Sequence, residues 1–190
     1  SGNPYATRTV AGAPDVGVRV QQQLEATTFV ANLLASANLP GLRILARSEI
    51  PSNLVNRDVV WVGDGIVGML TVVPPGLAKS QDDVASTIIG SDAQLCKGEF
   101  ASGAKPTPTG GAVAVKRFFT SCKTTDAYVV QYSVIPLTRG GFYTMAHIMQ
   151  APTAQAAGAQ ATIPDAARAV KMTLNPEEAD QRLISFIPTA

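Results

Sequence analysis

The sequence predicts an α+β fold in which an antiparallel sheet of about five or six strands packs against helices. Three β-rich runs, 113–122, 127–137 and 142–150, follow one another with only short polar turns between them, which is typical of an antiparallel meander. Before them, the apolar runs 59–62 and 66–73 are separated by Gly63-Asp64-Gly65, whose glycines suit a tight hairpin turn. The sequence therefore predicts a hairpin followed by a three-stranded meander.

A first helix is expected over 16–37, capped by Asp15 and ended by Leu39-Pro40-Gly41. One face of this helix is predicted to be buried by residues that recur with the helical period: Val20, Leu24, Thr27, Ala31 and Leu34. Phe29 and Leu33 lie on the other side, so we expect cover on more than one face.

A second helix is expected from Ser80, because the Ser80 hydroxyl can accept a hydrogen bond from an early N–H of the helix. Asp82 and Asp83 then suit the positive end of the helix dipole. Val84, Ile88 and Leu95 form its predicted inward stripe, and Lys97-Gly98 ends it with Cys96 at the inward edge of the last turn.

The remaining segments complete a single domain over 15–190 behind a flexible arm at 1–14. A short strand is expected over 42–47 and a Gly/Pro/Thr/Ser loop over 101–111. An Ala/Gln-rich linker at 151–161 precedes a third helix over 162–174. The apolar tail 183–187 is expected to dock as a helical turn or an edge strand.

Composition excludes two classes of function. The formal net charge is +1, from 15 Lys and Arg against 14 Asp and Glu, without a block of either sign. Nucleic-acid binding is therefore not expected, since it needs clustered cations. The hydrophobic runs fall short of the roughly 18 residues that span a bilayer, so no transmembrane segment is expected.

The two cysteines, Cys96 and Cys122, decide the expected compartment. An even pair suits a disulfide in an exported protein, and the end of a helix can meet the end of a strand if the helix lies across the sheet. The alternative is two buried reduced thiols. We expect a periplasmic or secreted protein whose opening, Ser1-Gly2-Asn3-Pro4, is a processed start with the signal peptide removed. Whether residues 1–3 are native stays open.

The run Gly63-Asp64-Gly65-Ile66-Val67-Gly68 matches G-x-G-x-x-G, and Asp83 follows 20 residues after Gly63. A dinucleotide site would need a helix after the glycines. Here a short β-rich stretch ends at Pro74-Pro75, so the hairpin interpretation is preferred. No cofactor is expected.

His147 is the single histidine and lies in the last meander strand. As a catalytic base it would need an oriented nucleophile or carboxylate, and none is near in sequence. No hydrolase elbow, phosphate-binding loop or zinc-protease motif is present, and no metal site is expected. Arg139, Phe142 and Tyr143 at a hairpin tip could form an aromatic–arginine contact patch, a composition favoured at interfaces.

The segment Asp92-Ala93-Gln94-Leu95-Cys96-Lys97-Gly98-Glu99-Phe100-Ala101-Ser102, followed by Cys122 and a meander, resembles small uncharacterised exported proteins of proteobacteria. The order of hairpin, helix and meander also resembles the Mog1/PsbP-like α+β fold over 59–150. This resemblance implies a fold and no catalytic residues.

The function expected from the sequence is that of a non-enzymatic periplasmic module that binds a protein partner or a small apolar ligand. Arg139, Phe142, Tyr143 and His147 are the candidate contacts, and the oligomeric state stays open. The alternative is a hydrolase or lyase whose site converges around His147 in a concave pocket. A third reading is a purely structural envelope component.

Overall fold

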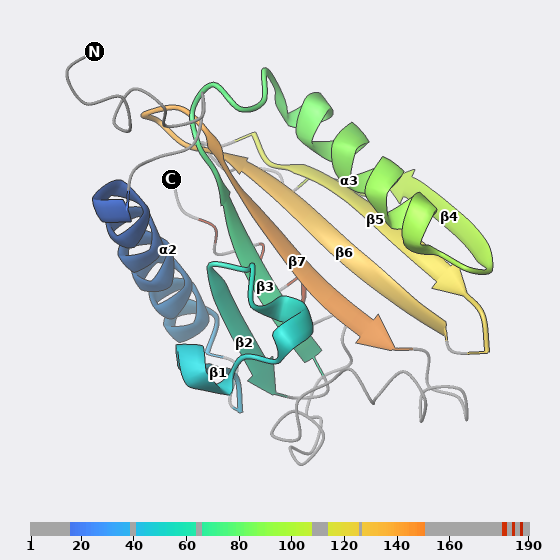
Figure 1. Cartoon of the computed structure of the whole chain (residues 1–190), viewed down its shortest axis with the longest axis horizontal. Helices are drawn as coiled ribbons and strands as arrows, with labels where there is room; N and C mark the ends of the chain where they lie inside the picture. Colours follow the sequence, from blue (N-terminus) through green and yellow to red (C-terminus); the bar gives the residue numbers. More distant parts are fainter. Residues whose placement is uncertain are drawn as a thin grey trace.

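The computed structural model describes residues 16–38, 41–63, 66–107, 114–125 and 127–150, together with 180, 181, 184 and 187. Its centre is a seven-stranded antiparallel sheet in the order β1-β2-β3-β7-β6-β5-β4. Helix α2 packs on one face of the sheet and helix α3 on the other, and they lie at opposite sides of the view in Figure 1. The predicted α+β fold is confirmed, with seven strands rather than five or six.

The helices are α2 (Val16–Ala37) and α3 (Gln81–Leu95), and two short 3-10 helices are η1 (Arg47–Glu49) and η2 (Ser52–Leu54). The strands are β1 (Arg43–Ile44), β2 (Val59–Gly63), β3 (Ile66–Val73), β4 (Glu99–Ala104), β5 (Lys116–Lys123), β6 (Ala127–Pro136) and β7 (Phe142–Gln150).

The predicted hairpin and meander are present. Strands β2 and β3 pair antiparallel with Gly63 opposite Ile66, so the glycine-containing motif joins two strands instead of a strand and a helix. Strands β5, β6 and β7 pair in succession. Strand β7 also pairs with β3, which joins the hairpin to the meander in one sheet.

Two predictions are wrong: the loop over 101–111 and the length of the strand over 42–47. The segment predicted as a loop over 101–111 begins as strand β4, which pairs along β5 from Glu99 opposite Lys123 to Ala104 opposite Phe118. Its small residues carry little strand propensity, so pairing with β5 decides its conformation. The strand expected over 42–47 stops after Ile44, because the Glu49 carboxylate accepts from the Ala46 N–H at 2.8 Å and turns the chain into η1.

The first helix has its predicted bounds, but its predicted buried face is wrong. The buried side chains are Ala26, Val30, Leu33 and Ala37. Val20 and Leu24 are more than half exposed. Because apolar residues occur all around this helix, its period does not select one face. The sheet selects it, since Phe29 packs on Tyr143 with ring centroids 5.0 Å apart.

The second helix starts as predicted, with the Ser80 hydroxyl accepting from the Asp83 N–H at 3.1 Å. Val84 and Ala85 are buried against Phe118 and Val134. Leu95, expected in the inward stripe, is 72% exposed. The reason is that Leu95 lies at the rim of an open cleft beside α3, where its side chain faces solvent.

Several predicted segments, the arm 1–14 with Asp15, the linker 151–161 and the third helix 162–174, lie outside the described residues. Of the tail, Ile184 is buried in the core on the α2 face and Ile187 packs against that core, so these two residues dock as expected. Neither α2 nor α3, the helices described, has a stretch long and apolar enough to cross a bilayer.

Candidate functional site

An open cleft of about 730 Å³ lies on the α3 face of the sheet. Its floor is formed by β3, β7 and β6, which run between η2 and α3 in Figure 1. One wall is α3, and the other is the segment around η2 with Asn53, Leu54 and Arg57. This cleft exists because α3 covers the β5 and β6 side of the face and η2 covers the β2 side, which leaves the middle strands between them.

The lining of the cleft is mainly apolar. Its apolar side chains are Leu54, Met69, Val73, Leu77, Ala78, Val84, Ile88, Leu95, Val130, Ala146 and Ile148. Leu77 and Leu95 are 61% and 72% exposed, so they present apolar surface at the rim. Strand alternation explains the floor, because Thr144, Ala146 and Ile148 of β7 point to this face while His147 points to the other.

The polar centre of the cleft is Asp92, in the last turn of α3. Its Oδ2 accepts hydrogen bonds from the Tyr132 hydroxyl at 2.6 Å and from the Thr120 hydroxyl at 2.7 Å. Tyr132 also stacks on Phe118, with ring centroids 4.8 Å apart. Three elements therefore meet at one carboxylate, which ties the end of α3 to β5 and β6.

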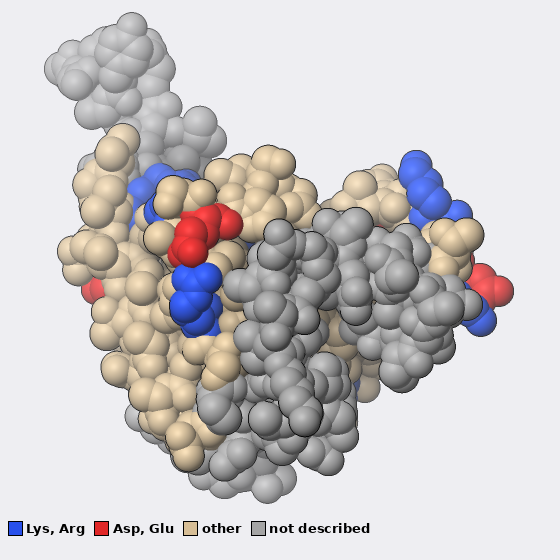
Figure 2. All heavy atoms as spheres, turned by 90° about the horizontal axis from the view of Figure 1, so that it is seen from below, with Lys and Arg blue, Asp and Glu red and all other residues tan. Residues whose placement is uncertain are grey.

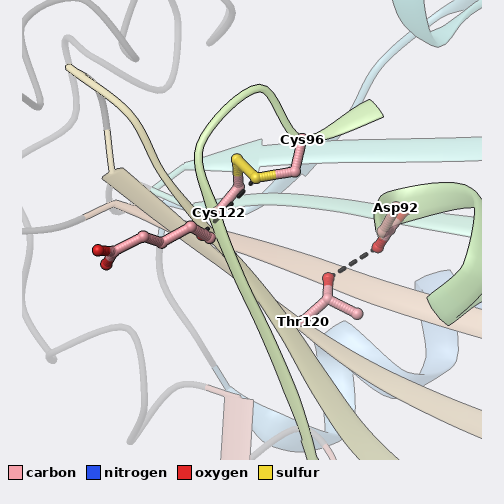
Figure 3. Close-up of a disulfide and its surroundings, with 5 residues drawn as sticks. Asp92, Cys96, Thr120 and Cys122 are labelled. Carbon is pink, nitrogen blue, oxygen red and sulfur yellow. Dashed lines mark hydrogen bonds between the residues drawn. A yellow bond between two sulfur atoms is a disulfide. The ribbon is translucent and has the colours of Figure 1, made fainter. Parts of the chain in front are cut away.

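A disulfide strengthens this tie. Cys96, the residue after α3, is bonded to Cys122 of β5 with Cα atoms 5.7 Å apart. Figure 3 shows the disulfide beside the hydrogen bond between Asp92 and Thr120. Asp92 and Cys96 are one helical turn apart, and Thr120 and Cys122 point to the same face of β5, so two tethers hold one end of the helix.

The electrostatics of the cleft favour neutral tyrosines. Burial raises the pKa of Tyr132, and the hydrogen bond to the Asp92 carboxylate raises it further. Burial also raises the pKa of Tyr128, and the charge of Asp92 adds to that shift. Both hydroxyls therefore stay protonated at neutral pH and Tyr132 remains a donor to Asp92.

The structure places His147 away from the cleft, on the α2 face of the sheet. It is 1% exposed, and its Nδ1 lies 2.6 Å from Oδ1 of Asp180. The other oxygen of Asp180 accepts from the Arg117 guanidinium and lies 4.0 Å from Nζ of Lys105. Trp61 contacts His147 edge-on, with ring centroids 5.5 Å apart.

This buried cluster lowers the pKa of Asp180. Burial by itself raises the pKa, but the hydrogen bond and charge of His147, followed by the charges of Arg117 and Lys105, outweigh it. His147 lines neither the cleft on the α3 face nor a smaller cleft beside Arg139. The cluster thus fastens residue 180 to the sheet.

The predicted contact patch is divided between two faces. Tyr143 is 5% exposed and packs under α2, while Phe142 points to the α3 face. Arg139 is exposed and forms an ion pair with Glu25 of α2. A small cleft of about 80 Å³ lies beside Arg139 and Tyr143. A contact role for Arg139, Phe142, Tyr143 or His147 stays a prediction.

Among the described residues visible from below, blue and red side chains occur in small groups separated by neutral surface (Figure 2). Within the described residues, no group of three His, Cys, Asp or Glu side chains could hold a metal ion.

The cluster of Asp92, Tyr132 and Thr120 was not predicted from the sequence. Their separations of 28 and 40 residues carry no local signal. The one available signal was Asp92, an acid in the last turn of a helix, where a negative charge opposes the helix dipole and needs donors. Asp180 was also missed, although it precedes an apolar tail that had to dock.

No protein-family model and no curated protein sequence matches this chain. Among solved structures, the chain is similar to a mutant of protein Mog1, with a TM-score of 0.45 and 12% sequence identity, over 77% of this chain and 85% of that chain. Mog1 is thus a weak structural neighbour, in line with the resemblance stated from the sequence. A likeness this weak carries no argument about the site.

Proposed function

We propose that this protein is a binding module that holds a small, largely apolar ligand in the cleft between α3 and η2. The observation that carries the proposal is the cleft itself, with its volume of about 730 Å³ and its mainly apolar lining around a few polar groups. Ligand sites in proteins are usually clefts of roughly 300–1,000 Å³ with this kind of lining.

The rim supports the same proposal. Leu77 and Leu95 expose apolar surface next to an already apolar floor, which is costly in water unless something covers it. The floor is also well supported, because β3, β7 and β6 are interior strands and the disulfide secures one wall. A rigid cleft loses little conformational entropy when a ligand binds.

The alternative of a hydrolase or lyase built on His147 is less well supported. A general base must reach the proton that it abstracts, directly or through one water. His147 is buried and its Nδ1 faces Asp180. A disulfide together with a mainly apolar cleft suits a ligand-binding protein of the periplasm or the exterior, and we propose that compartment.

The first experiment is native mass spectrometry of the gently purified, unreduced protein. A mass that exceeds the chain by a small molecule would support the proposal and define the ligand class. The second experiment measures binding of the neutral apolar probe N-phenylnaphthylamine by fluorescence.

Ser91→Trp is the test variant because Ser91 lines the cleft on α3, and Ser86→Trp is the matched control because Ser86 is exposed on the same helix outside it. We expect Ser91→Trp to weaken probe binding at least tenfold and Ser86→Trp to leave it unchanged. Equal binding by both variants would show that the cleft is not the site.

A further inference from the structure

The cleft contains one carboxylate without a cationic partner. Asp92 is the single acid among the described lining residues, and it forms no ion pair within the described part of the chain. Both of its hydrogen bonds, from Tyr132 and Thr120, end on Oδ2. Oδ1 makes no hydrogen bond to any described residue, so it keeps its capacity to accept.

The position of Asp92 makes a positive partner favourable. It lies in the last turn of α3, where the helix dipole presents its negative end, and no basic residue occupies that turn. A negative side chain there is destabilised, and a cation close to it is stabilised by both the carboxylate and the helix end. The hydroxyls of Tyr132 and Thr120 offset part of this cost without neutralising the charge.

Aromatic rings lie beside this carboxylate. Tyr128 and Tyr132 both line the cleft, four residues apart on the same face of β6, and the charge of Asp92 acts on both hydroxyls. Rings of tyrosine attract a cation placed over them, and such sites often combine aromatic faces with a carboxylate. Half-buried carboxylates also bind charged donors more strongly than neutral ones.

The positive charge of the cleft, that of Arg57, lies on the wall opposite Asp92. Arg57 is the single cation among the lining residues, and it is exposed on the opposite wall, where water can solvate it. The charge of Arg57 reaches Tyr132, yet Arg57 and Asp92 form no ion pair, so the carboxylate beside the tyrosines has no direct counter-ion among the described residues. Charge complementarity thus favours a cationic group on the ligand.

We propose that the ligand is an apolar molecule with a protonated amine, an inference that rests on the proposed function. Its ammonium group binds Asp92 Oδ1 beside Tyr128 and Tyr132. The apolar body then covers the floor formed by Val130, Ala146 and Ile148 and reaches the rim at Leu77 or Leu95.

The test compares three probes with the same tail, octylamine, octanol and octanoate, by titration calorimetry on the oxidised protein near neutral pH. We expect octylamine to bind at least tenfold more tightly than octanol. Asp92→Asn should remove this preference while octanol binding is retained, which shows that the variant is folded with its cleft intact. Thr120→Val removes a hydrogen bond to Asp92 but no charge, and it should keep the preference for the amine.

Each other outcome has a separate meaning. Equal binding of octylamine and octanol to the unaltered protein would overturn the cation inference and leave the apolar cleft as proposed. Tightest binding of octanoate, lost in Arg57→Gln, would overturn it in favour of an anionic ligand. Loss of the preference in Thr120→Val would assign the effect to the anchoring of α3 and would also overturn it. If none of the three probes binds saturably, the proposed function fails as well.

Discussion

Replacing Asp180 with asparagine is expected to destabilise the protein strongly. Asp180 is 1% exposed and its carboxylate contacts Arg117, which is 5% exposed, and His147. Asparagine keeps the shape of the side chain but removes its charge. Arg117 then stays buried without its main counter-ion.

Removing one partner of a buried ion pair costs about 3–5 kcal/mol, because the remaining charge is left without compensation. The asparagine oxygen can still accept a hydrogen bond from Arg117, so we expect the lower end of that range, about 3 kcal/mol. Domains are typically stable by about 5–15 kcal/mol, so this is a large share of the total. With urea m-values of about 1–3 kcal/mol/M, the midpoint should fall by roughly 1–3 M.

The assay is urea unfolding followed by circular dichroism, with the double variant Arg117→Met/Asp180→Leu as the control. The double variant removes both charges of the Arg117–Asp180 pair and should regain most of the lost stability, since apolar replacements of buried pairs are often neutral or stabilising. A loss below about 1 kcal/mol in Asp180→Asn would refute the reasoning. So would a double variant that is as unstable as the single one.

The same contact predicts a dependence on acid. The pKa of Asp180 is lowered in the folded protein relative to its ordinary value of 3.8. Its stabilising contribution is therefore complete above that value and is lost as the pH falls toward the lower folded pKa. Unfolding free energy measured between about pH 5 and pH 2 should fall more steeply in the unaltered protein than in Asp180→Asn. Parallel curves would contradict the assigned ion pair.

Three further predictions concern packing, the disulfide and the hairpin. Gly68→Ala should lower the free energy of unfolding by about 1–3 kcal/mol, since a Cβ at Gly68 would lie 2.1 Å from the Trp61 ring. Its control is Gly90→Ala, which has nothing within 4 Å of the added Cβ and should stabilise α3 by up to about 1 kcal/mol. Equal effects of the two variants in urea unfolding would refute this packing. The double variant Cys96→Ser/Cys122→Ser should lose about 3.5 kcal/mol of unfolding free energy, which is the chain-entropy value for a separation of 26 residues. An unchanged urea midpoint would contradict a stabilising role of the disulfide. Arg139→Ala should leave the urea midpoint nearly unchanged, because its ion pair with Glu25 is exposed; a large fall would mean that the pair secures α2.

The sequence alone identified the elements with a clear local signal. The end of helix 16–37 follows from the proline-containing stop after it, and the start of α3 follows from the Ser80 cap, signals that act over a few neighbouring residues. The meander and the hairpin follow from alternating β-rich runs and their turns. The cysteine pair was named from its number and placement, and the structure brings the two sulfurs to bonding distance.

Tertiary structure decided which faces these elements use. Helix α2 is apolar on several sides, so only the sheet could select Ala26 and Val30 over Val20 and Leu24. Strand β4 depends on pairing with β5, because Glu99–Ala104 has little strand propensity of its own.

The candidate site likewise appears only in three dimensions. Asp92, Thr120 and Tyr132 come from α3, β5 and β6, and they meet because the helix is held across the sheet. Asp180 reaches Arg117 over a separation of 63 residues. Local patterns report on a residue's neighbours along the chain, whereas a cleft and a buried ion pair depend on where distant segments pack.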